Sequence, residues 1–334
     1  MTKTTTPDAV ICVDMGTTNT RVWIVSRGQI VERVVEPVGL RDAARQRSKS
    51  VVPNAIRELL AAACDRATHL DLRVDHALAA GMLTSPLGLC EVPHISAPAG
   101  EIELAGSIYK FLDPGVASLP IYLVPGVRSG PSWPSIEELA RTDLIRGEET
   151  IVVGLLQAGI LSPNSTLLNL GSHWKSILID HECRIASSFT TLSGELIHAL
   201  QTQTILASAL PEGRRLESLN KEWLEHGRKY QAQNGLGRSM FSVRLLEQLF
   251  GIDQTALSSF LLGAIVESDY RSMEKSERFK GPVVIAGTGA AAEAWQETLQ
   301  AASRASEHFG LEVVERAFVR GLIRLFDLYV ASGR

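Results

Sequence analysis

Two segments far apart in the sequence repeat one pattern: an apolar strand, a turn with glycine and hydroxyl residues, and a second apolar strand. The turns begin at Asp14 and Gly171. Links this short require the strands on either side to be antiparallel neighbours. The repeat predicts two similar α/β halves, whose turns could hold a triphosphate between them. The predicted strands are residues 9–13, 21–26 and 29–35 in the first half and 166–170, 176–179 and 184–189 in the second.

Length and composition are those of a two-domain soluble protein. The 334 residues suit two domains of about 150 residues, and the turn-forming residues 162–165 predict domains at 1–163 and 164–334. The net charge of −4 argues against nucleic acid as the main partner. Residues 1–8 are polar, and no apolar run approaches the roughly 18 residues of a membrane span. We therefore expect a cytoplasmic protein without membrane association, and a homodimer is possible.

The remaining sequence alternates between helical and strand patterns, as expected of an α/β fold. A Pro- and Gly-rich segment at 128–142 is typical of a surface loop. The predicted helices are 51–66, 147–157, a long stretch from 194 to about 260 interrupted at 233–237, 254–268, 290–302 and 313–330, and the further strands are 76–80, 121–124 and 283–286.

The first turn has the residue types of a phosphate and metal site. The carboxylate of Asp14 could hold Mg²⁺ directly or through water, because magnesium prefers few carboxylates together with phosphate oxygens. Gly16 lets the backbone approach a phosphate closely. Backbone N–H groups and the side chains of Thr17, Thr18 and Asn19 could donate to phosphate oxygens. The alternative is a hairpin turn without a ligand, since Asp and Gly favour turns in general.

The second turn again combines glycine with a hydroxyl, in Gly171 and Ser172. Lys175 adds a positive charge suited to phosphate or carboxylate, although it could also be a solvated strand residue. His173 could be a hydrogen-bonded structural imidazole.

A third turn, Gly287, Thr288 and Gly289, lies between a predicted strand and a predicted helix. It could direct backbone N–H groups at a ligand. The pattern is common in α/β proteins, and the chain has neither a GxGxxG fingerprint nor a P-loop.

These motifs resemble the two phosphate motifs and the adenosine motif of the actin-like ATPase superfamily. More narrowly, the chain resembles the 2-dehydro-3-deoxygalactonokinase family, in collinear order from about residue 10 to 325. The blocks 146–150 and 171–175 are the specific ones, whereas 287–289 is not. The shared stretches are 14–21, 80–82, 124–126, 146–150, 171–175, 193–196 and 286–288.

The resemblance implies two ribonuclease-H-like domains with nucleotide in the cleft between them, and a last helix at about 313–330 that packs back on the first domain. It also implies ATP and Mg²⁺ as cofactors. The γ-phosphate would pass to the 6-hydroxyl of 2-dehydro-3-deoxy-D-galactonate, giving 2-dehydro-3-deoxy-6-phosphogalactonate in galactose and galactonate catabolism.

One departure from the family pattern concerns the second phosphate motif, which usually carries an Asp. Here Asn169 and Leu170 precede Gly171, so the metal must rely on Asp14 and water. The 128–142 loop also looks long for the family.

Phosphoryl transfer needs a group that orients or deprotonates the acceptor hydroxyl. Glu148 and Glu149 are the candidates, with first-turn helix capping as the alternative for one of them. The substrate carboxylate calls for a cation, and Lys175, Arg146 and Arg21 are nearest in the motifs, unless they form structural ion pairs. The resemblance further suggests that the sugar site includes Gly81, Met82, Ser85, His173, Gly194 and Glu195.

Three alternatives stay open at this point. One is an exopolyphosphatase-like phosphate hydrolase on the same fold, and another is a kinase of the gluconate epimer of the sugar acid. The third is a nucleotide sensor without catalysis, against which the presence of Asp14, Glu148 and Glu149 argues. The two epimers differ at one hydroxyl, whose hydrogen bonds the sequence does not place.

Overall fold

The computed structural model describes residues 8–133, 135–210 and 218–333, so residues 1–7, whose polar composition entered the expectation of a cytoplasmic protein, lie outside the described residues. The chain forms two compact units and passes between them after residues 130, 143, 160 and 314. Among the described helices, none has both the length and the apolar composition to cross a membrane. Unit 1 comprises residues 1–130, 144–160 and 315–334, and unit 2 comprises residues 131–143 and 161–314.

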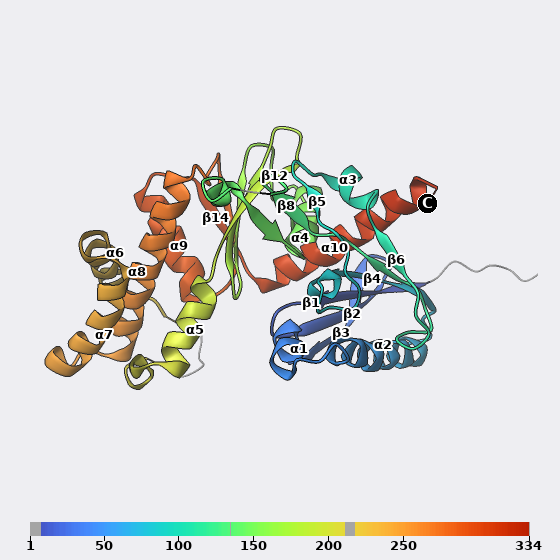
Figure 1. The fold of residues 1–334 in the computed structure, drawn as a ribbon, viewed down its shortest axis with the longest axis horizontal. Helices are drawn as coiled ribbons and strands as arrows, with labels where there is room; N and C mark the ends of the chain where they lie inside the picture. The colour runs from blue at the N-terminus through green and yellow to red at the C-terminus, as the bar shows by residue number, and fades with distance from the viewer. Residues whose placement is uncertain (1–7, 134, 211–217, 334) are drawn as a thin grey trace, which may run out of the picture. The chain divides into compact units, whose positions relative to one another are not determined.

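Unit 1 is built on a six-stranded sheet in the order β3-β2-β1-β4-β7-β6 (Figure 1). The first three strands are antiparallel, whereas β1, β4 and β7 run parallel to one another. The short turn at Arg27 and Gly28 joins β2 to β3, and both residues have positive φ, as tight hairpins require. The strands are β1 (Ala9–Met15), β2 (Thr20–Ser26), β3 (Gln29–Glu36), β4 (Val74–Gly81), β6 (Tyr109–Phe111) and β7 (Ile121–Leu123).

Helices cover both faces of this sheet, because alternate side chains of a strand point to opposite faces. Ile11 and Ile24 share a core with α2, whereas the ring of Trp23 lies 5.6 Å from that of Phe318 on α10. The helices α4 and α10 cross closely at Gly154, where a Cβ would collide with the backbone of α10. The helices of unit 1 are α1 (Leu40–Gln46), α2 (Val51–His69), α3 (Glu101–Ala105), α4 (Glu148–Gln157) and most of α10 (Leu311–Ala331).

Unit 2 repeats this design with the sheet order β12-β11-β10-β13-β14. The pairs β10–β11 and β11–β12 are antiparallel, and β10–β13 and β13–β14 are parallel. The order and the directions match those of β3-β2-β1-β4-β7 in unit 1. The strands are β10 (Thr166–Leu170), β11 (Trp174–Ile179), β12 (Ile185–Thr191), β13 (Val283–Ala286) and β14 (Ser306–Phe309).

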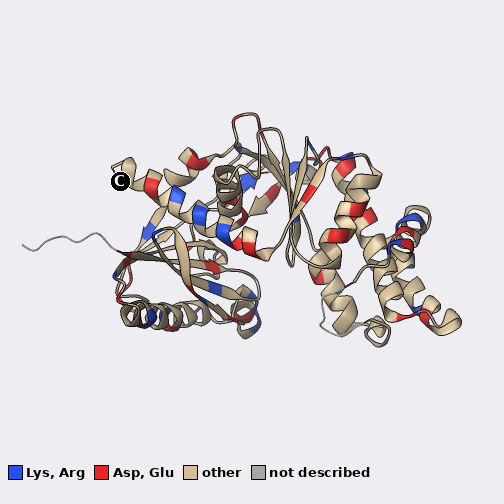
Figure 2. Ribbon diagram, turned by 180° about the vertical axis from the view of Figure 1, so that it is seen from behind, with Lys and Arg blue, Asp and Glu red and all other residues tan. Residues whose placement is uncertain are grey.

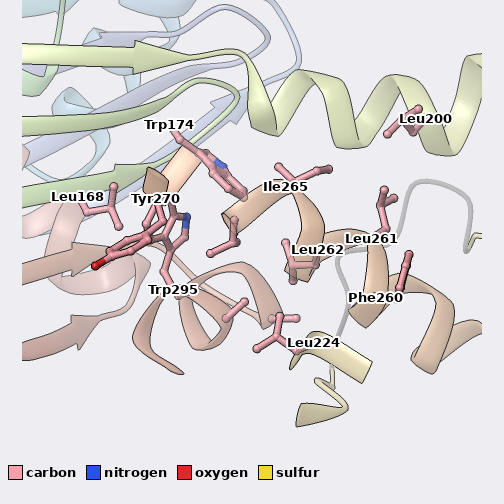
Figure 3. Close-up of a cluster of buried hydrophobic side chains, with 14 of the residues drawn as sticks. Leu168, Trp174, Leu200, Leu224, Phe260, Leu261, Leu262, Ile265, Tyr270 and Trp295 are labelled. Atoms are coloured by element: carbon pink, nitrogen blue, oxygen red, sulfur yellow. The ribbon is translucent and has the colours of Figure 1, made fainter. Parts of the chain in front are cut away.

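A larger apolar core joins the sheet of unit 2 to its helices (Figure 3). Leu168 and Trp174 from the sheet meet Ile265 on α8 and Trp295 on α9 in this core. The helices α6 and α8 pack with direct backbone contact, because Gly227 and Gly263 have no side chain to hold them apart. The helices of unit 2 are α5 (Ser193–Gln203), α6 (Lys221–Asn234), α7 (Leu236–Phe250), α8 (Gln254–Lys275) and α9 (Ala290–Ala301).

Charged residues of both signs lie on the same helices, as α10 shows in Figure 2. Its Arg324 pairs with Glu101, and Glu315 pairs with Arg33, all within unit 1. This mixture matches a net charge of only −4.

Most predicted elements are present, but the predicted long helix from 194 to about 260 is wrong. That stretch contains α5, the short helix Ile205–Ser208, α6 and α7, with a break near Gly235 where the loop was predicted. The sequence pattern did not reveal all of these breaks, because each of the short helices has an amphipathic periodicity of its own. The sequence patterns missed several short elements, among them α1, α3, β6, β14 and a small sheet of β5 (Ile95–Ser96), β8 (Val127–Ser129) and β9 (Asp143–Ile145).

The 128–142 segment begins at the end of β8 and otherwise contains only the short helix Leu139–Arg141 among its described residues. Pro134 lies outside the described residues. Trp133 is 93% exposed and Ile136 is 77% exposed. This agrees with the predicted surface loop.

Candidate functional site

The turn between β1 and β2 is short and rigid. Met15 pairs with Thr20, so that residues 16–19 close the hairpin, and the Gly16 N–H donates to the Asn19 carbonyl at 2.9 Å. The side-chain amide of Asn19 donates to the hydroxyl of Thr18 at 3.1 Å. The chain thus holds the four predicted phosphate-binding residues of this turn in one backbone arrangement.

The start of α1 packs against the back of this turn. The Leu40 and Arg41 N–H groups donate to the carbonyls of Gly16 and Thr17. A Cβ at Gly39 would lie 2.5 Å from the Thr17 carbonyl oxygen, so only glycine fits there. The sequence interpretation missed Gly39. The only sequence signal for its role is that Gly39 directly precedes α1, and this helix was too short to predict.

Asp14 lies near the carboxyl end of β1, beside the parallel strand β4, where ligands of α/β sheets commonly bind. Its Oδ2 accepts a hydrogen bond from Arg21 at 3.0 Å. Its Oδ1 faces two glycines: a Cβ at Gly81 would lie 3.1 Å from this oxygen, and one at Gly147 would lie 3.9 Å away. Both glycines have positive φ, a backbone conformation that favours glycine over residues with a side chain. At these two positions, therefore, no side chain lies next to Oδ1 of Asp14.

The electrostatics of Asp14 combine burial with mixed charges. Burial, with smaller contributions from the charges of Glu148 and Glu315, raises the pKa of Asp14 to about 6, although Arg21 opposes this rise. Such a balance is typical of functional carboxylates.

The two adjacent glutamates of α4 have different surroundings. Glu149 is 0% exposed, and both of its oxygens accept the Gly147 N–H at 2.8 Å. Glu148 is half-buried and accepts the Arg146 N–H at 3.2 Å. Both glutamates thus accept backbone N–H groups at the start of α4, and they differ in burial, because Glu149 is fully buried and Glu148 is half-buried.

Arg146 is held by unit 1 itself. Its guanidinium donates to the Thr84 hydroxyl at 2.5 Å and to the Val92 carbonyl at 3.1 Å, and it lies 3.2 Å from Nδ1 of His94. Burial, Arg146 and Arg128 lower the pKa of His94 to about 4, so this imidazole is neutral at pH 7. The sequence interpretation missed His94, which belongs to none of the shared motifs.

Arg21 belongs to a chain of charges that reaches α10. Besides Asp14, its guanidinium approaches Glu315, which in turn pairs with Arg33.

The sugar-site candidates Met82 and Ser85 belong to the tight bend after β4. The Ser85 hydroxyl donates to the Met82 carbonyl at 2.8 Å, which fixes this bend next to Gly81.

The turn between β10 and β11 has the same kind of support. A Cβ at Gly194 would collide with the Gly171 carbonyl and lie 2.6 Å from the Ser172 carbonyl oxygen. The Glu195 N–H donates to this Ser172 carbonyl at 2.8 Å. The structure thus brings four predicted residues together here, and His173 lies 3.7 Å from the Glu195 carboxylate.

Lys175 and the third turn complete the predicted residues of unit 2. Lys175 lies opposite Asn169 in the ladder and is only 9% exposed, so it is not the solvated strand residue of the alternative interpretation. In the third turn, the Gly287 N–H donates to the Phe309 carbonyl, and Gly289 begins α9 with positive φ. Thr288 lies between these two glycines at the start of the helix.

The residues near Asp14 fit a magnesium ion. No group of three or more His, Cys, Asp or Glu side chains suited to a metal occurs within the described residues. Magnesium needs no such cage, because it keeps several waters and binds one or two carboxylates together with phosphates. Oδ1 of Asp14, next to Gly81 and Gly147, is the oxygen that fits this role.

The chain is similar to known proteins over most of its length. Residues 14–325 match the model of the 2-keto-3-deoxy-galactonokinase family. A candidate 2-dehydro-3-deoxygalactonokinase from Sinorhizobium meliloti superposes with a TM-score of 0.74 at 21% identity, over 95% of this chain and 97% of that one. A candidate N-acetylglucosamine kinase from Porphyromonas gingivalis superposes with a TM-score of 0.50 at 14% identity, over 93% and 98% of the two chains. Among curated proteins, none matches the chain significantly.

At these identities the two solved structures bear on the fold alone. They confirm the predicted α/β class, because the chain shares its fold with these two proteins.

Proposed function

The chain belongs to the 2-keto-3-deoxy-galactonokinase family, and we propose that it transfers the γ-phosphate of ATP to the 6-hydroxyl of 2-dehydro-3-deoxy-D-galactonate. As a member of this family it is a sugar-acid kinase, a phosphotransferase with an alcohol group as acceptor. The proposed product is 2-dehydro-3-deoxy-6-phosphogalactonate, formed in the cytoplasm during galactonate catabolism.

One observation carries the proposal for the chemistry: the carboxylate of Glu149 is buried on the Gly147 N–H, while Glu148, the residue that follows Gly147, is only half-buried. We therefore assign Glu148 to the acceptor hydroxyl and Glu149 to the start of α4. The sugar hydroxyl oxygen bonds to the γ-phosphorus as the bond to the bridging oxygen of ADP breaks. The hydroxyl proton passes to Glu148, which orients the hydroxyl for in-line attack.

Asp14 would hold Mg²⁺ through Oδ1, directly or through water, and the bound ion would neutralise charge on the phosphates. Arg21 orients Asp14 through its hydrogen bond to Oδ2. The turn at Gly16, Thr17, Thr18 and Asn19 donates hydrogen bonds to phosphate oxygens in this proposal. Backbone N–H groups in such turns are suited to bind anions.

Unit 2 has the second set of proposed nucleotide contacts. Gly171, Ser172 and Lys175 bind phosphate, and the turn 287–289 binds adenosine. An Asp at position 169 would bind a metal ion, whose positive charge would face the phosphates. Asn169 is neutral, so in this proposal the positive charge of Lys175, opposite Asn169 in the ladder, replaces part of that metal charge. The positive charge of this mostly buried lysine suits this task because its ammonium can donate to phosphate oxygens.

The sugar acid would be recognised by Gly81, Met82, Ser85, His173, Gly194 and Glu195, with Arg21 and Arg146 supplying positive charge for its carboxylate. Arg146 is already fixed by Thr84 and Val92, so its guanidinium would need little ordering when substrate binds.

The test is a coupled ATP assay with 2-dehydro-3-deoxy-D-galactonate and its gluconate epimer, followed by ³¹P and ¹³C NMR of the product. We expect phosphate on the 6-oxygen and a higher kcat/KM for the galactonate. No turnover of either acid would refute the substrate assignment. Release of phosphate at the same rate without a sugar acid would instead indicate the hydrolase alternative.

A further inference from the structure

The residue that anchors the second turn comes from outside every motif of the sequence. Asp269, in the middle of α8, is 8% exposed. Its Oδ2 accepts two hydrogen bonds, from the hydroxyl of Thr191 at 2.7 Å and from that of Ser193 at 2.6 Å. Buried carboxylates are costly unless such donors satisfy them, so this cluster requires a reason.

These two hydroxyls lie where β12 ends and α5 begins. Thr191 is the last residue of β12, and Ser193 is the first of α5. The two hydroxyls are also 3.1 Å from each other. Asp269 therefore joins the strand end and the helix start to α8, which is packed into the largest core of unit 2.

The same helix start is in contact with the phosphate-binding turn proposed above. Gly194 packs directly on the carbonyls of Gly171 and Ser172, and the Glu195 N–H donates to the Ser172 carbonyl. A displacement at Ser193 must therefore move the turn, because no side chain separates Gly194 from it. A continuous path of contacts leads from Asp269 through Ser193 and Gly194 to Ser172.

We propose that Asp269 is a positioning residue that sets the phosphate-binding turn 171–173 through the hydroxyls of Thr191 and Ser193. The proposal rests on the proposed function, because it assumes that this turn binds the phosphates of ATP. Asp269 itself touches no substrate. Its role is to keep α5 pressed against the turn, so that the turn keeps its shape before nucleotide binds.

Burial raises the pKa of Asp269, and the hydrogen bonds from Ser193 and Thr191 lower it. The hydroxyls of Thr191 and Ser193 need a hydrogen-bond acceptor at position 269, and a neutral oxygen can fill this role as well as a charged one. Asn should therefore replace Asp269 well, because its amide oxygen can accept both hydrogen bonds. Ala should not, because it leaves both donors without an acceptor.

The experiment measures the affinity of the full-length protein for a non-hydrolysable ATP analogue with Mg²⁺ by calorimetry, and KM for ATP and for the sugar acid. We expect Asp269→Ala to weaken analogue binding about tenfold or more, because small displacements of positioning groups can cost up to about a hundredfold. KM for ATP should rise with it, and KM for the sugar acid should change less than about twofold. Asp269→Asn should stay within about twofold of the wild type.

Ser258→Ala is the matched control. Ser258 is buried on the same helix, and its hydroxyl has no hydrogen-bond partner within the described residues. This variant should bind the analogue as the wild type does. If Asp269→Ala does not fold, Ser193→Ala carries the test, with a smaller loss of affinity expected because Thr191 still reaches Asp269.

Equal affinity of the wild type and Asp269→Ala, or of the wild type and Ser193→Ala where the first does not fold, would overturn the role of Asp269. A loss in Asp269→Asn as large as that in Asp269→Ala would overturn the acceptor geometry. Failure of the wild type to bind the analogue would overturn the proposed function as well, so the two failures are distinguishable.

Discussion

The turn after β1 and the turn after β10 occupy matching positions in two sheets of the same strand order, yet they differ in charge. In unit 1, Asp14 lies opposite Arg21 in the ladder, and in unit 2 Asn169 lies opposite Lys175. A carboxylate paired with a guanidinium suits a metal ion. A neutral amide beside a buried ammonium suits a phosphate oxygen. One backbone design thus supports two different electrostatic tasks.

The two turns are also supported from behind by different means. Each is contacted by a glycine at the start of a helix, Gly39 in unit 1 and Gly194 in unit 2. The helix of Gly39 is capped by its own Asp42, which accepts the Gly39 N–H at 2.9 Å. The helix of Gly194 depends on Asp269 from another helix. Local sequence therefore shapes the first turn, whereas packing of α8 shapes the second.

The strongest test of this comparison exchanges the residues at the matching positions. Asp14→Asn should lower kcat about a thousandfold, because it removes the only carboxylate assigned to the metal. Steady-state kinetics over a range of Mg²⁺ concentrations measure this. The matched variant Asn169→Asp should change kcat less than about tenfold. Equal losses in the two variants would contradict the division of tasks.

The two glutamates of α4 give the next largest effect. Glu148→Gln should lower kcat about a hundredfold or more, as loss of a general base commonly does. Glu149→Gln should have a smaller effect on kcat and should lower Tm, because Glu149 is buried on the Gly147 N–H. Turnover and thermal unfolding of both variants measure the difference. A larger kinetic loss in Glu149→Gln would reverse the assignment.

The glycines behind the turns predict a moderate effect. Gly39→Ala and Gly194→Ala place a Cβ against turn backbone, and each should cost about 1–3 kcal/mol of unfolding free energy through overpacking. KM for ATP should rise in both. Gly237→Ala is the control, because nothing lies within 4 Å of its Cβ position on α7. That variant should be neutral or stabilised by up to about 1 kcal/mol. Chemical denaturation would show whether the pair differs from the control.

An effect of similar size, confined to one pH window, concerns the titration of Asp14. The pKa of Asp14 is raised to about 6 in the folded protein, above its ordinary value of 3.8. The folded state therefore binds more protons than the unfolded state in this window. The contribution of Asp14 to stability is full below about pH 4 and is lost as pH rises through about 6.

Without Mg²⁺, Asp14→Asn should therefore be more stable than the wild type at pH 8, by about 1–3 kcal/mol, and this difference should disappear toward pH 4. Urea unfolding of both proteins across this range measures it. Added Mg²⁺ and nucleotide should stabilise only the wild type appreciably. A difference that is constant with pH would show that titration of Asp14 does not cause it.

Much of the fold could be predicted because strand and turn patterns are local. The hairpins at 14–20 and 169–175 and the helices α2, α4 and α9 follow from periodicity and short links. The strands β6 and β14 could not be predicted in this way, because they lack the buried apolar run that marks the equally short strands β7 and β13. The breaks at 204 and 251 escaped because the amphipathic pattern continues on both sides of them.

The candidate site shows the same division between residues that local motifs reveal and residues that matter through distant contacts. The shared motifs contained Asp14, Gly81, Gly147 and Glu148, and the structure brings these four residues together within unit 1. Gly39 and Asp269 were missed because their importance lies in contacts with distant residues. The chemical roles of all these residues stay proposals until the variants are measured.

The sequence by itself determined that the chain contains two strand–turn–strand units with different polar residues, because short links and alternation leave few other arrangements. Only the tertiary structure decided which glutamate is accessible and which residue anchors the second turn. Glu148 and Glu149 are chemically identical neighbours, and they differ only in what surrounds them. Asp269 lies 76 residues from Ser193 in the sequence, and the packing of α8 alone brings its carboxylate within 2.6 Å of that hydroxyl.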